Sequence, residues 1–394
     1  MTMSPAAVTP DDLDYPLDSA RIATRPAEPR DAARMLVLHR AQDRIEHRHV
    51  RDIVGYLDPA GALIVNETRV EAMRFLAVRD GDGRTCEGLF VDPAGDGLWR
   101  VMIRGAKHFA YGDVLRLTPP QDDAHARGHG EGERASGSTV EVRLERRDGA
   151  HWVVSVCGGL TAAAAWKAAG WTPLPPYILA ARQQRGELQA AADQADRQEY
   201  QTVYARTSDL PSCAAPTAGL HFTPQLLQRI AAQGVETIRT ELQVGPGTFR
   251  PVGAPTLAAH PMHSERCRVS AAALSALHSC NMPASLVVGT TSVRLLESLP
   301  RPLSGEVLAR ARELIGAGQG DRTVMDFATD ILIAPGSDFR WTNRLLTNFH
   351  LPRSTLLALV GALVGLDRLK RIYAIAQREE YRFYSFGDAM LILP

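Results

Sequence analysis

The chain has 394 residues, of which 45% are hydrophobic and 22% charged, and its basic and acidic residues balance to a formal net charge of +0. Because this length exceeds one ordinary hydrophobic core, we expect two domains. A balanced charge excludes a global field that draws the protein toward nucleic acid or an anionic membrane, so any such contact needs a local basic patch.

The 5 cysteines are scattered along the chain without a C-x-x-C pair. This spacing argues against a disulfide framework and against a zinc ribbon. Residues 1–14 are polar and lack the apolar run of a signal peptide. The longest apolar run, residues 356–366, is too short to span a bilayer. We therefore expect a cytoplasmic protein with no membrane segment.

The first part of the chain predicts few regular elements. Residues 1–20 are expected to form a loose arm, and the two prolines in 26–31 indicate a turn. Residues 32–38 predict a helix or a strand, because their periodicity does not separate the two. The short apolar run 62–66 follows Gly61 and predicts a buried strand.

The pattern changes between Val70 and Val156, where short alternating runs are separated by Gly/Asp turns. These runs predict six strands of an antiparallel barrel or sandwich, at 73–78, 87–91, 99–103, 114–117, 140–144 and 152–156. Residues 121–138, rich in Gly, His, Asp and Glu, predict a surface loop inside this region.

After Gly158 helices and strands alternate. We expect a largely solvent-facing polar helix over 188–203, and further helices at 224–233 and 271–278. Strands are expected at 235–242, 285–289 and 331–334. This alternation predicts an α/β domain with a mixed or mostly parallel sheet. If the strand at 62–66 joins that sheet, the chain has a larger α/β domain, residues 1–69 and 157–394, with a smaller inserted antiparallel β-barrel domain at 70–156.

The segment 346–355 combines six polar side chains with Pro352 and runs into an apolar stretch. Ser354 is expected to cap a helix there. His350 and Arg353 then lie at a helix N-terminus, where free N–H groups and the helix dipole favour an anionic ligand group. The alternative is a well-capped buried helix whose His350 bonds only its own loop.

Two further polar clusters lie at ends of predicted strands, where α/β folds bind ligands. In 214–223 small residues allow a ligand close to the backbone, and His221 can act as donor, acceptor or base. A tight turn with a core histidine is the alternative. Residues 244–251 lack the lysine and glycine spacing of a P-loop. They suggest a loop that opens a cavity for a flat ring, or a plain Gly/Pro turn.

Three more clusters follow. Residues 260–265 favour a general base, His263 or Glu265, over a metal site, because Pro261 disturbs regular ligand spacing; a solvated loop is the alternative. Residues 288–297 predict a hydroxyl-rich turn that binds a carboxylate or phosphate with help from Arg294, or an ordinary capped helix. Residues 381–390 alternate aromatic and polar side chains, as a base-stacking surface or an edge strand does.

Taken together, these segments resemble the S-adenosylmethionine:tRNA ribosyltransferase-isomerase family of queuosine biosynthesis. Their order and spacing match over nearly the whole chain. Additional matching segments are Leu63–Val70, Pro173–Ile178 and Tyr200–Ala205. The family combines an α/β domain with an inserted β-barrel, which agrees with the change of periodicity described above.

The resemblance implies a transferase that moves and isomerises the ribosyl moiety of S-adenosylmethionine onto 7-aminomethyl-7-deazaguanine in tRNA. The products are epoxyqueuosine-tRNA, adenine and methionine. S-adenosylmethionine is then a co-substrate and tRNA a partner, and the chemistry needs no metal or redox cofactor. We expect the protein to be a monomer.

The resemblance also suggests roles for individual residues. His263 or Glu265 would be the base, His221 would assist the departure of adenine, and Arg294 or Arg353 would bind the methionine carboxylate. Three side chains would position the ribose or the modified base: Asn348, His350 and Asp388. The remaining expected substrate-binding residues are Thr217, Gly219, Gly247, Thr248, Thr290 and Thr291.

Three positions depart from the family pattern. Gln243 replaces the usual histidine and cannot transfer a proton, Glu67 replaces the usual aspartate, and Leu179-Ala180 stand where a basic residue is usual. Two competing hypotheses are a paralogue that uses S-adenosylmethionine on another amine and a non-catalytic RNA-binding protein. The positions that could form a basic helical face for tRNA, or a solvated helix surface, are Arg368, Lys370, Arg371 and Arg378.

Overall fold

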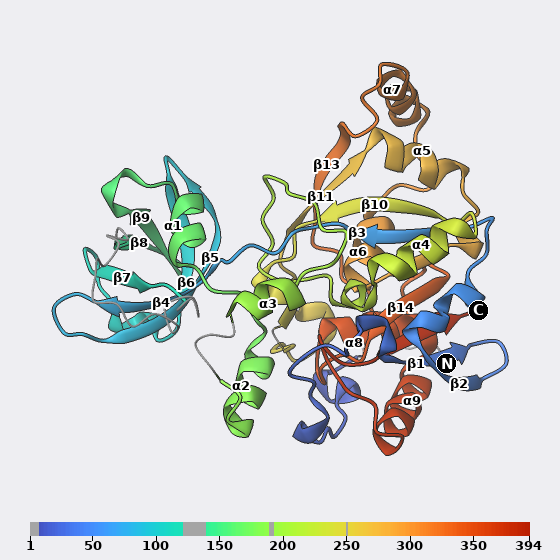
Figure 1. The fold of residues 1–394 in the computed structure, drawn as a ribbon, viewed down its shortest axis with the longest axis horizontal. Helices are drawn as coiled ribbons and strands as arrows, with labels where there is room; N and C mark the ends of the chain where they lie inside the picture. Colours follow the sequence, from blue (N-terminus) through green and yellow to red (C-terminus); the bar gives the residue numbers. More distant parts are fainter. Residues whose placement is uncertain (1–7, 121–138, 189–192, 250) are drawn as a thin grey trace, which may run out of the picture. The chain divides into compact units, whose positions relative to one another are not determined.

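The computed structural model describes residues 8–120, 139–188, 193–249 and 251–394, and the chain forms two compact units (Figure 1). The first unit comprises Met1–Arg69, Pro175–Ala181 and Gln201–Pro394, and the second comprises Val70–Leu174 and Arg182–Tyr200. The domain limits expected from the sequence, 70–156 for the barrel, stay a prediction. The loop expected at 121–138 lies outside the described residues.

A nine-stranded mixed sheet forms the centre of the first unit, in the order β13-β11-β10-β3-β12-β14-β15-β1-β2. Pairing is parallel between β10 and β3, β3 and β12, β12 and β14, and β15 and β1, and antiparallel elsewhere. The predicted α/β class with a mixed sheet is therefore confirmed. The strands are β1 (Arg34–His39), β2 (Arg44–His49), β3 (Ala62–Asn66), β10 (Glu236–Leu242), β11 (Glu265–Ser270), β12 (Leu286–Val288), β13 (Thr323–Thr329), β14 (Arg344–Asn348) and β15 (Ala389–Leu393).

The inner strands are apolar on both faces because helices cover both sides of the sheet. In β3, Leu63 and Val65 belong to one core and Ile64 to the other. The smaller core is closed by α4 (Pro224–Ala232), through Leu226 and Ile230. The larger core is closed by α5 (Ala271–Ser279), α6 (Thr290–Ser298), α7 (Gly305–Gly316), α8 (Thr355–Val364) and α9 (Leu366–Arg378).

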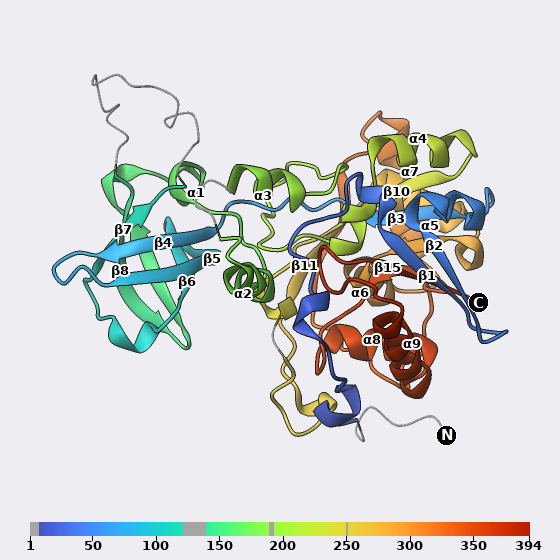
Figure 2. The ribbon, with the colours of Figure 1, turned by 60° about the horizontal axis from the view of Figure 1, so that its bottom comes forward.

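Side-chain caps determine where several helices begin. The hydroxyl groups of Thr223, Ser270, Ser304 and Ser354 each accept a backbone N–H in the first turn of the helix that follows. The cap predicted at Ser354 is thus confirmed, with its Oγ 3.1 Å from the Leu357 nitrogen. Two of the helices, α8 and α9, lie side by side (Figure 2).

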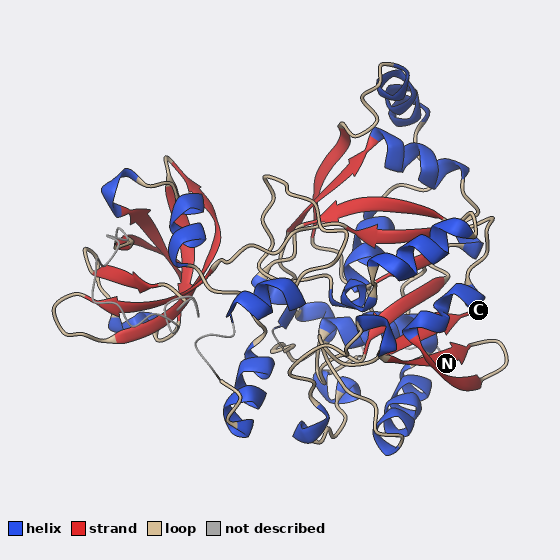
Figure 3. Cartoon of the chain, in the orientation of Figure 1, coloured by secondary structure: helices blue, strands red, loops and turns tan. Residues whose placement is uncertain are grey.

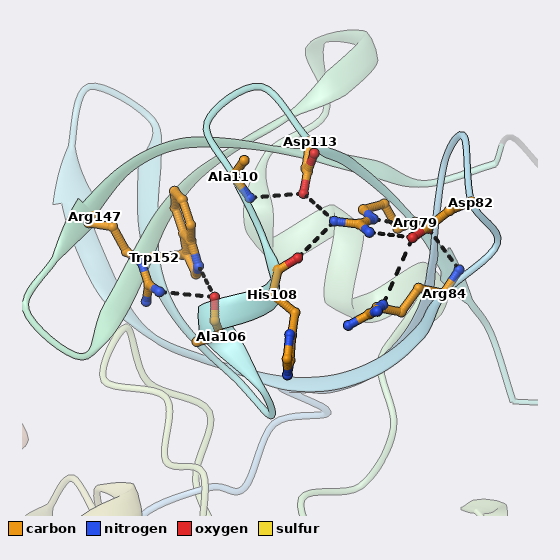
Figure 4. Close-up of polar contacts among 9 residues, drawn as sticks. All are labelled: Arg79, Asp82, Arg84, Ala106, His108, Ala110, Asp113, Arg147 and Trp152. Atoms are coloured by element: carbon orange, nitrogen blue, oxygen red, sulfur yellow. Dashed lines mark hydrogen bonds and ion pairs between the residues drawn. The ribbon is translucent and has the colours of Figure 1, made fainter.

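The second unit contains a closed antiparallel barrel in the order β4-β5-β6-β9-β8-β7, as the alternating runs predicted. Figure 4 shows polar contacts on it: the Arg79 guanidinium donates to Asp113 Oδ2 at 3.0 Å, and Arg147 stacks over the Trp152 ring. The strands are β4 (Arg74–Arg79), β5 (Thr85–Gly95), β6 (Leu98–Ile103), β7 (Val114–Thr118), β8 (Glu141–Asp148) and β9 (His151–Val156). The helices α1 (Ala162–Ala169), α2 (Pro176–Arg185) and α3 (Asp193–Glu199) follow in the chain.

Three expectations about regular structure are wrong (Figure 3). Residues 331–334 form no strand, because the Thr329 hydroxyl accepts the Ile331 N–H at 3.2 Å where β13 ends. Within residues 381–388, Phe383 forms only an isolated bridge with Ile22 and residues 385–386 form a turn, and the strand after them, β15, lies inside the sheet rather than at its edge. The helix expected over 188–203 is wrong at its end, because α3 stops at Glu199; Gln194, Arg197 and Gln198 are exposed as expected, while Asp193 and Asp196 are buried.

The expected loose arm is also wrong for the described residues 8–20. Val8 and Leu13 are completely buried in the larger core. The Tyr15 hydroxyl donates to the backbone carbonyl of His350, which ties this segment to the loop before α8. Apolar side chains spaced along a polar segment were enough to fix it against the α/β unit.

Candidate active site

Two adjoining cavities lie in the α/β unit, where β12 and β14 end and β15 begins. The first, which we call the hydroxyl cavity, has an empty volume of about 490 Å³ including solvent at its mouth. The second, the arginine cavity, has about 480 Å³. Thr248 and Leu356 line both, so the two cavities share a wall. Their position agrees with the rule that α/β sheets bind ligands at the carboxyl ends of parallel strands.

Neutral polar groups and aromatic rings line the hydroxyl cavity. It is formed by Tyr177, Ala215, Pro216, Thr217, Ala218, Thr248, Gly289, Thr290, Thr291, Thr347, Asn348, Phe349, His350, Leu351, Leu356, Tyr384 and Ser385. The Thr217 hydroxyl donates to Asn348 Oδ1 at 2.8 Å, and Asn348 Nδ2 donates to the Tyr384 carbonyl at 3.1 Å. These two bonds fix the orientation of the amide at the cavity wall.

The start of α6 contributes to the same cavity. Gly289 precedes the helix with φ 84°, a backbone conformation that a side chain would strain, and it provides no side-chain cap. The Thr291 hydroxyl is buried and has no hydrogen-bond partner among the described residues. An uncapped helix start with a spare hydroxyl can donate to a polar or anionic ligand group.

His350 lines the hydroxyl cavity and also bonds its own loop. Its Nε2 lies 2.7 Å from the Thr347 hydroxyl, and its backbone N–H donates to the Tyr373 hydroxyl at 2.9 Å. Burial lowers the pKa of the His350 imidazole to about 3. The ring is therefore neutral near pH 7, and it can position a ligand but cannot supply positive charge to one.

The arginine cavity contains a buried ion pair. It is lined by Gly247, Thr248, His260, Met262, His263, Glu265, Arg294, Ile331, Leu332, Ile333, Thr355, Leu356 and Leu359. Arg294 Nη1 contacts Glu265 Oε2, and Oε1 of the same carboxyl accepts the Gly245 N–H at 3.1 Å. Burial raises the pKa of Glu265, and the Arg294 charge opposes that rise. Both carboxyl oxygens are thus engaged within the protein.

Two histidines project from the loop before β11. His263 is exposed and lies against the backbone of Gly247, where an added Cβ would come within 2.0 Å of the imidazole Cδ2. His260 is half-buried, and its Nδ1 has no hydrogen-bond partner among the described residues. Burial lowers the pKa of His260, which favours the neutral ring. Only a glycine at position 247 allows this close approach of loop and imidazole.

Four of the expected site residues do not line either cavity. Gly219 packs against the Tyr204 hydroxyl, and Asp388 pairs with Arg382 at 3.2 Å. Arg353 pairs with two residues of the N-terminal segment, Asp11 and Asp14.

His221 is the fourth, and it is buried with both ring nitrogens near carbonyl oxygens. Its Nδ1 lies 3.0 Å from the Ala218 oxygen and its Nε2 2.9 Å from the Gly387 oxygen. Burial lowers the pKa of His221, while the two carbonyl groups oppose that shift. The ring joins the turn before α4 to the turn before β15.

Sequence reasoning assigned no role to several residues that line the hydroxyl cavity. Tyr177, at the start of α2, has its hydroxyl 2.5 Å from the Ser385 Oγ. Its ring lies 4.7 Å, centroid to centroid, from that of Tyr384. The only sequence signal for Tyr177 was its place in the matching segment Pro173–Ile178.

None of the residues that depart from the family pattern lines either cavity. Gln243 donates from Nε2 to the Pro211 carbonyl at 2.8 Å, and Glu67 lies 3.7 Å from Arg239. On α9, Arg368 and Arg371 both pair with Asp43. Part of the basic charge expected to face tRNA is therefore neutralised within the protein.

The described residues contain neither a candidate metal cluster nor a candidate membrane helix. No group of three or more His, Cys, Asp or Glu side chains in this part of the chain is placed to hold a metal ion. No helix among the same residues is long and apolar enough to cross a membrane.

Comparison with known proteins agrees with the resemblance seen in the sequence. Residues 10–392 match the family model described as Queuosine biosynthesis protein. Proteins named S-adenosylmethionine:tRNA ribosyltransferase-isomerase are 40% identical over 389 residues in Moorella thermoacetica and 39% identical over 399 residues in Symbiobacterium thermophilum. In both cases the match covers 97% of this chain and 99% of the relative.

A relative of the same name from Cereibacter sphaeroides is 40% identical over 388 residues, with 97% of this chain and 98% of the relative covered. The solved S-adenosylmethionine tRNA ribosyltransferase from Thermotoga maritima is 26% identical with a TM-score of 0.46, and the match covers 97% of this chain and 100% of that one. The near-complete matches to the curated relatives show that this chain belongs to the S-adenosylmethionine:tRNA ribosyltransferase-isomerase family of queuosine biosynthesis proteins.

Proposed function

We propose that this protein transfers and isomerises the ribosyl moiety of S-adenosylmethionine onto 7-aminomethyl-7-deazaguanine in tRNA, releasing adenine and methionine. The observation that carries this proposal is the pair of adjoining cavities, one neutral and hydroxyl-lined and the other containing a buried arginine. Such a division suits a ligand with a sugar and a flat base at one end and a charged group at the other. The reaction as proposed uses S-adenosylmethionine as a co-substrate and needs no metal or redox cofactor.

The reaction requires a base for the acidic ribose carbon beside the sulfonium. His263 is our candidate, because it lines the arginine cavity and a neutral imidazole nitrogen can accept a proton. Glu265 is less suited, since both of its oxygens already have partners. Its contacts with the Gly245 N–H and with Arg294 favour a positioning role.

The hydroxyl cavity would hold the ribose and the modified base. The fixed amide of Asn348 and the hydroxyl groups of Thr217 and Thr291 offer donors and acceptors for sugar hydroxyls or a base edge. The adjacent, mutually tilted rings of Tyr177 and Tyr384 offer apolar surface beside them. His221 would act on adenine departure only indirectly, by holding the turn before β15 in place.

Other properties complete the proposal. We infer that tRNA is the macromolecular substrate, that the protein acts in the cytoplasm, and that it is a monomer with residues 1–69 and 157–394 as the catalytic domain. The barrel, expected at 70–156, would then be free to contribute to RNA binding, as small barrels do in other proteins.

The test is a single-turnover assay with purified protein in excess over tRNA that carries 7-aminomethyl-7-deazaguanine. S-adenosylmethionine labelled in its ribose is added, and adenine release and label in the tRNA are followed together. We expect both to appear at the same rate and in equal amounts. The matched control is the same tRNA with unmodified guanine, which lacks the acceptor amine and should give neither product.

The competing hypotheses predict different outcomes in this assay. Binding of S-adenosylmethionine without products on either tRNA, but adenine release with another amine, would support a paralogue with a different acceptor. Binding of tRNA with no adenine release from any amine would support a non-catalytic RNA-binding protein.

A further inference from the structure

Arg294 has two donors that the protein leaves unused. The residue is only 7% exposed, yet its Nε and Nη2 have no hydrogen-bond partner among the described residues. Only Nη1 is engaged, by Glu265. A buried N–H without a partner costs free energy, so two of them on one guanidinium at the wall of a cavity indicate a ligand-binding site.

The two unused donors have a definite geometry. Nε and Nη2 form one edge of the planar guanidinium, with their N–H groups side by side, and such an edge matches the two oxygens of a carboxylate. Glu265 occupies Nη1, at the other side of the group, and does not block this edge. Glu265 also fixes the guanidinium in place, so little conformational entropy is lost when a ligand binds.

The other walls of the arginine cavity suit an amino acid with an apolar side chain. Ile331, Ile333 and Leu359 form an apolar wall. His260 presents an Nδ1 without a partner on a ring that burial keeps neutral. A neutral imidazole nitrogen can accept a hydrogen bond from an ammonium group when the other ring nitrogen carries the hydrogen.

We propose that the arginine cavity binds the α-amino-acid end of S-adenosylmethionine, with the carboxylate on the Nε/Nη2 edge of Arg294. This inference rests on the proposed function and names the part of the substrate that this cavity recognises. The shared wall of Thr248 and Leu356 then lies where the sulfonium centre joins the amino-acid end to the ribose in the hydroxyl cavity. Arg353, held by Asp11 and Asp14, takes no part in carboxylate binding.

The experiment measures affinity by isothermal titration calorimetry on the full chain, with and without saturating unmodified tRNA. The ligands are S-adenosylmethionine and its decarboxylated analogue, which lacks only the carboxylate. We expect the analogue to bind the unaltered protein at least about 100-fold more weakly, because each of the two hydrogen bonds to a charged group contributes about tenfold or more. This comparison needs no variant and so does not depend on how a substitution affects folding.

The variant Arg294→Lys then tests whether Arg294 causes the difference in affinity between the two ligands. Lysine keeps a positive charge beside Glu265 but lacks the planar edge, so S-adenosylmethionine should bind about 10- to 100-fold more weakly while the analogue binds as before. The matched control is Arg266→Lys. Arg266 follows Glu265 in β11, and its exposed side chain pairs with Asp326. That control should change neither affinity by more than about twofold.

If the unaltered protein bound the two ligands with equal affinity and still released adenine, the proposed function would stand but this inference would be wrong. A preference that survives in Arg294→Lys but disappears in Arg353→Gln would also overturn it, by moving the carboxylate to the other arginine. Absence of S-adenosylmethionine binding under every condition would overturn the inference together with the proposed function.

Discussion

Glu265 and Arg294 form a buried ion pair that joins the first residue of β11 to α6. Removing one member leaves the other as an uncompensated buried charge. We therefore expect Glu265→Ala to lower the free energy of unfolding by about 3–5 kcal/mol, measured by urea denaturation. The control is Asp321→Ala, which removes an exposed partner of Arg206 and should cost no more than about 1 kcal/mol. A loss in Glu265→Ala as small as in the control would show that the pair is solvated.

The role proposed for His263 predicts a loss of rate without a loss of stability. Because the side chain is exposed, His263→Ala should leave the unfolding midpoint nearly unchanged. The single-turnover rate should fall by about 10²- to 10⁴-fold, the usual contribution of a general base. His278→Ala, at an exposed position on α5, is the matched control. An unaltered rate in a folded His263→Ala protein would remove His263 as the base.

The close approach of Gly247 to His263 gives an independent test of the same site. An added Cβ at position 247 would lie within 2.0 Å of the imidazole, so Gly247→Ala must displace the histidine or the loop. We expect the turnover rate to fall at least about tenfold, because small misplacements of a catalytic group are costly. Gly253→Ala adds the same methyl group where no atom lies within 4 Å, and it should retain full activity. Equal activity of the two variants would mean that the position of the imidazole is unimportant.

The buried imidazole of His350 predicts that acid destabilises the protein. Burial lowers its pKa from 6.5 to about 3, so between these values the unfolded chain binds a proton that the folded chain does not. The stability that this neutral ring contributes is complete above about pH 6.5 and is lost as the pH falls toward 3, by at most about 1.4 kcal/mol per pH unit. Urea denaturation at several pH values in that window measures the slope.

In His350→Gln this contribution to the slope should disappear, while the contribution of the similarly buried His221 remains. His278→Gln, which alters an exposed ring, should leave the slope as it is in the unaltered protein. A slope in His350→Gln identical to that of the unaltered protein would show that His350 titrates normally in the folded state.

Loss of the hydrogen bond between Thr347 and His350 should lower the stability of the protein. Thr347→Val keeps the shape of the side chain but removes the hydroxyl that lies 2.7 Å from the imidazole Nε2. The buried ring nitrogen then lacks a partner, and the free energy of unfolding should fall by about 1–3 kcal/mol. Thr355→Val, a matched change at the start of α8 just beyond the capping Ser354, should cost less than about 1 kcal/mol. If Thr355→Val lowered the free energy of unfolding more than Thr347→Val, the hydrogen bond between Thr347 and His350 would not be the important contact.

Local chemistry in the sequence was enough to predict the elements that depend on near neighbours. The barrel strands follow from alternation of side chains, and the start of α8 follows from a serine that reaches a backbone N–H three residues along. The same local reasoning failed at residues 331–334. Their apolar side chains read as a strand, but Ile331 and Ile333 line a cavity instead.

Tertiary structure alone decided which of two arginines keeps hydrogen-bond donors without a partner among the described residues. Both Arg294 and Arg353 stand beside a helix start in the sequence, and both looked suited to an anion. In the folded chain Arg353 meets Asp14, more than three hundred residues away, whereas Arg294 meets Glu265 and keeps one edge unused. The sequence by itself determined the family, the periodicity of the elements and the types of side chain available. Which of those side chains share a cavity depended on ion pairs and packing between segments far apart in the chain, and no local pattern records those contacts.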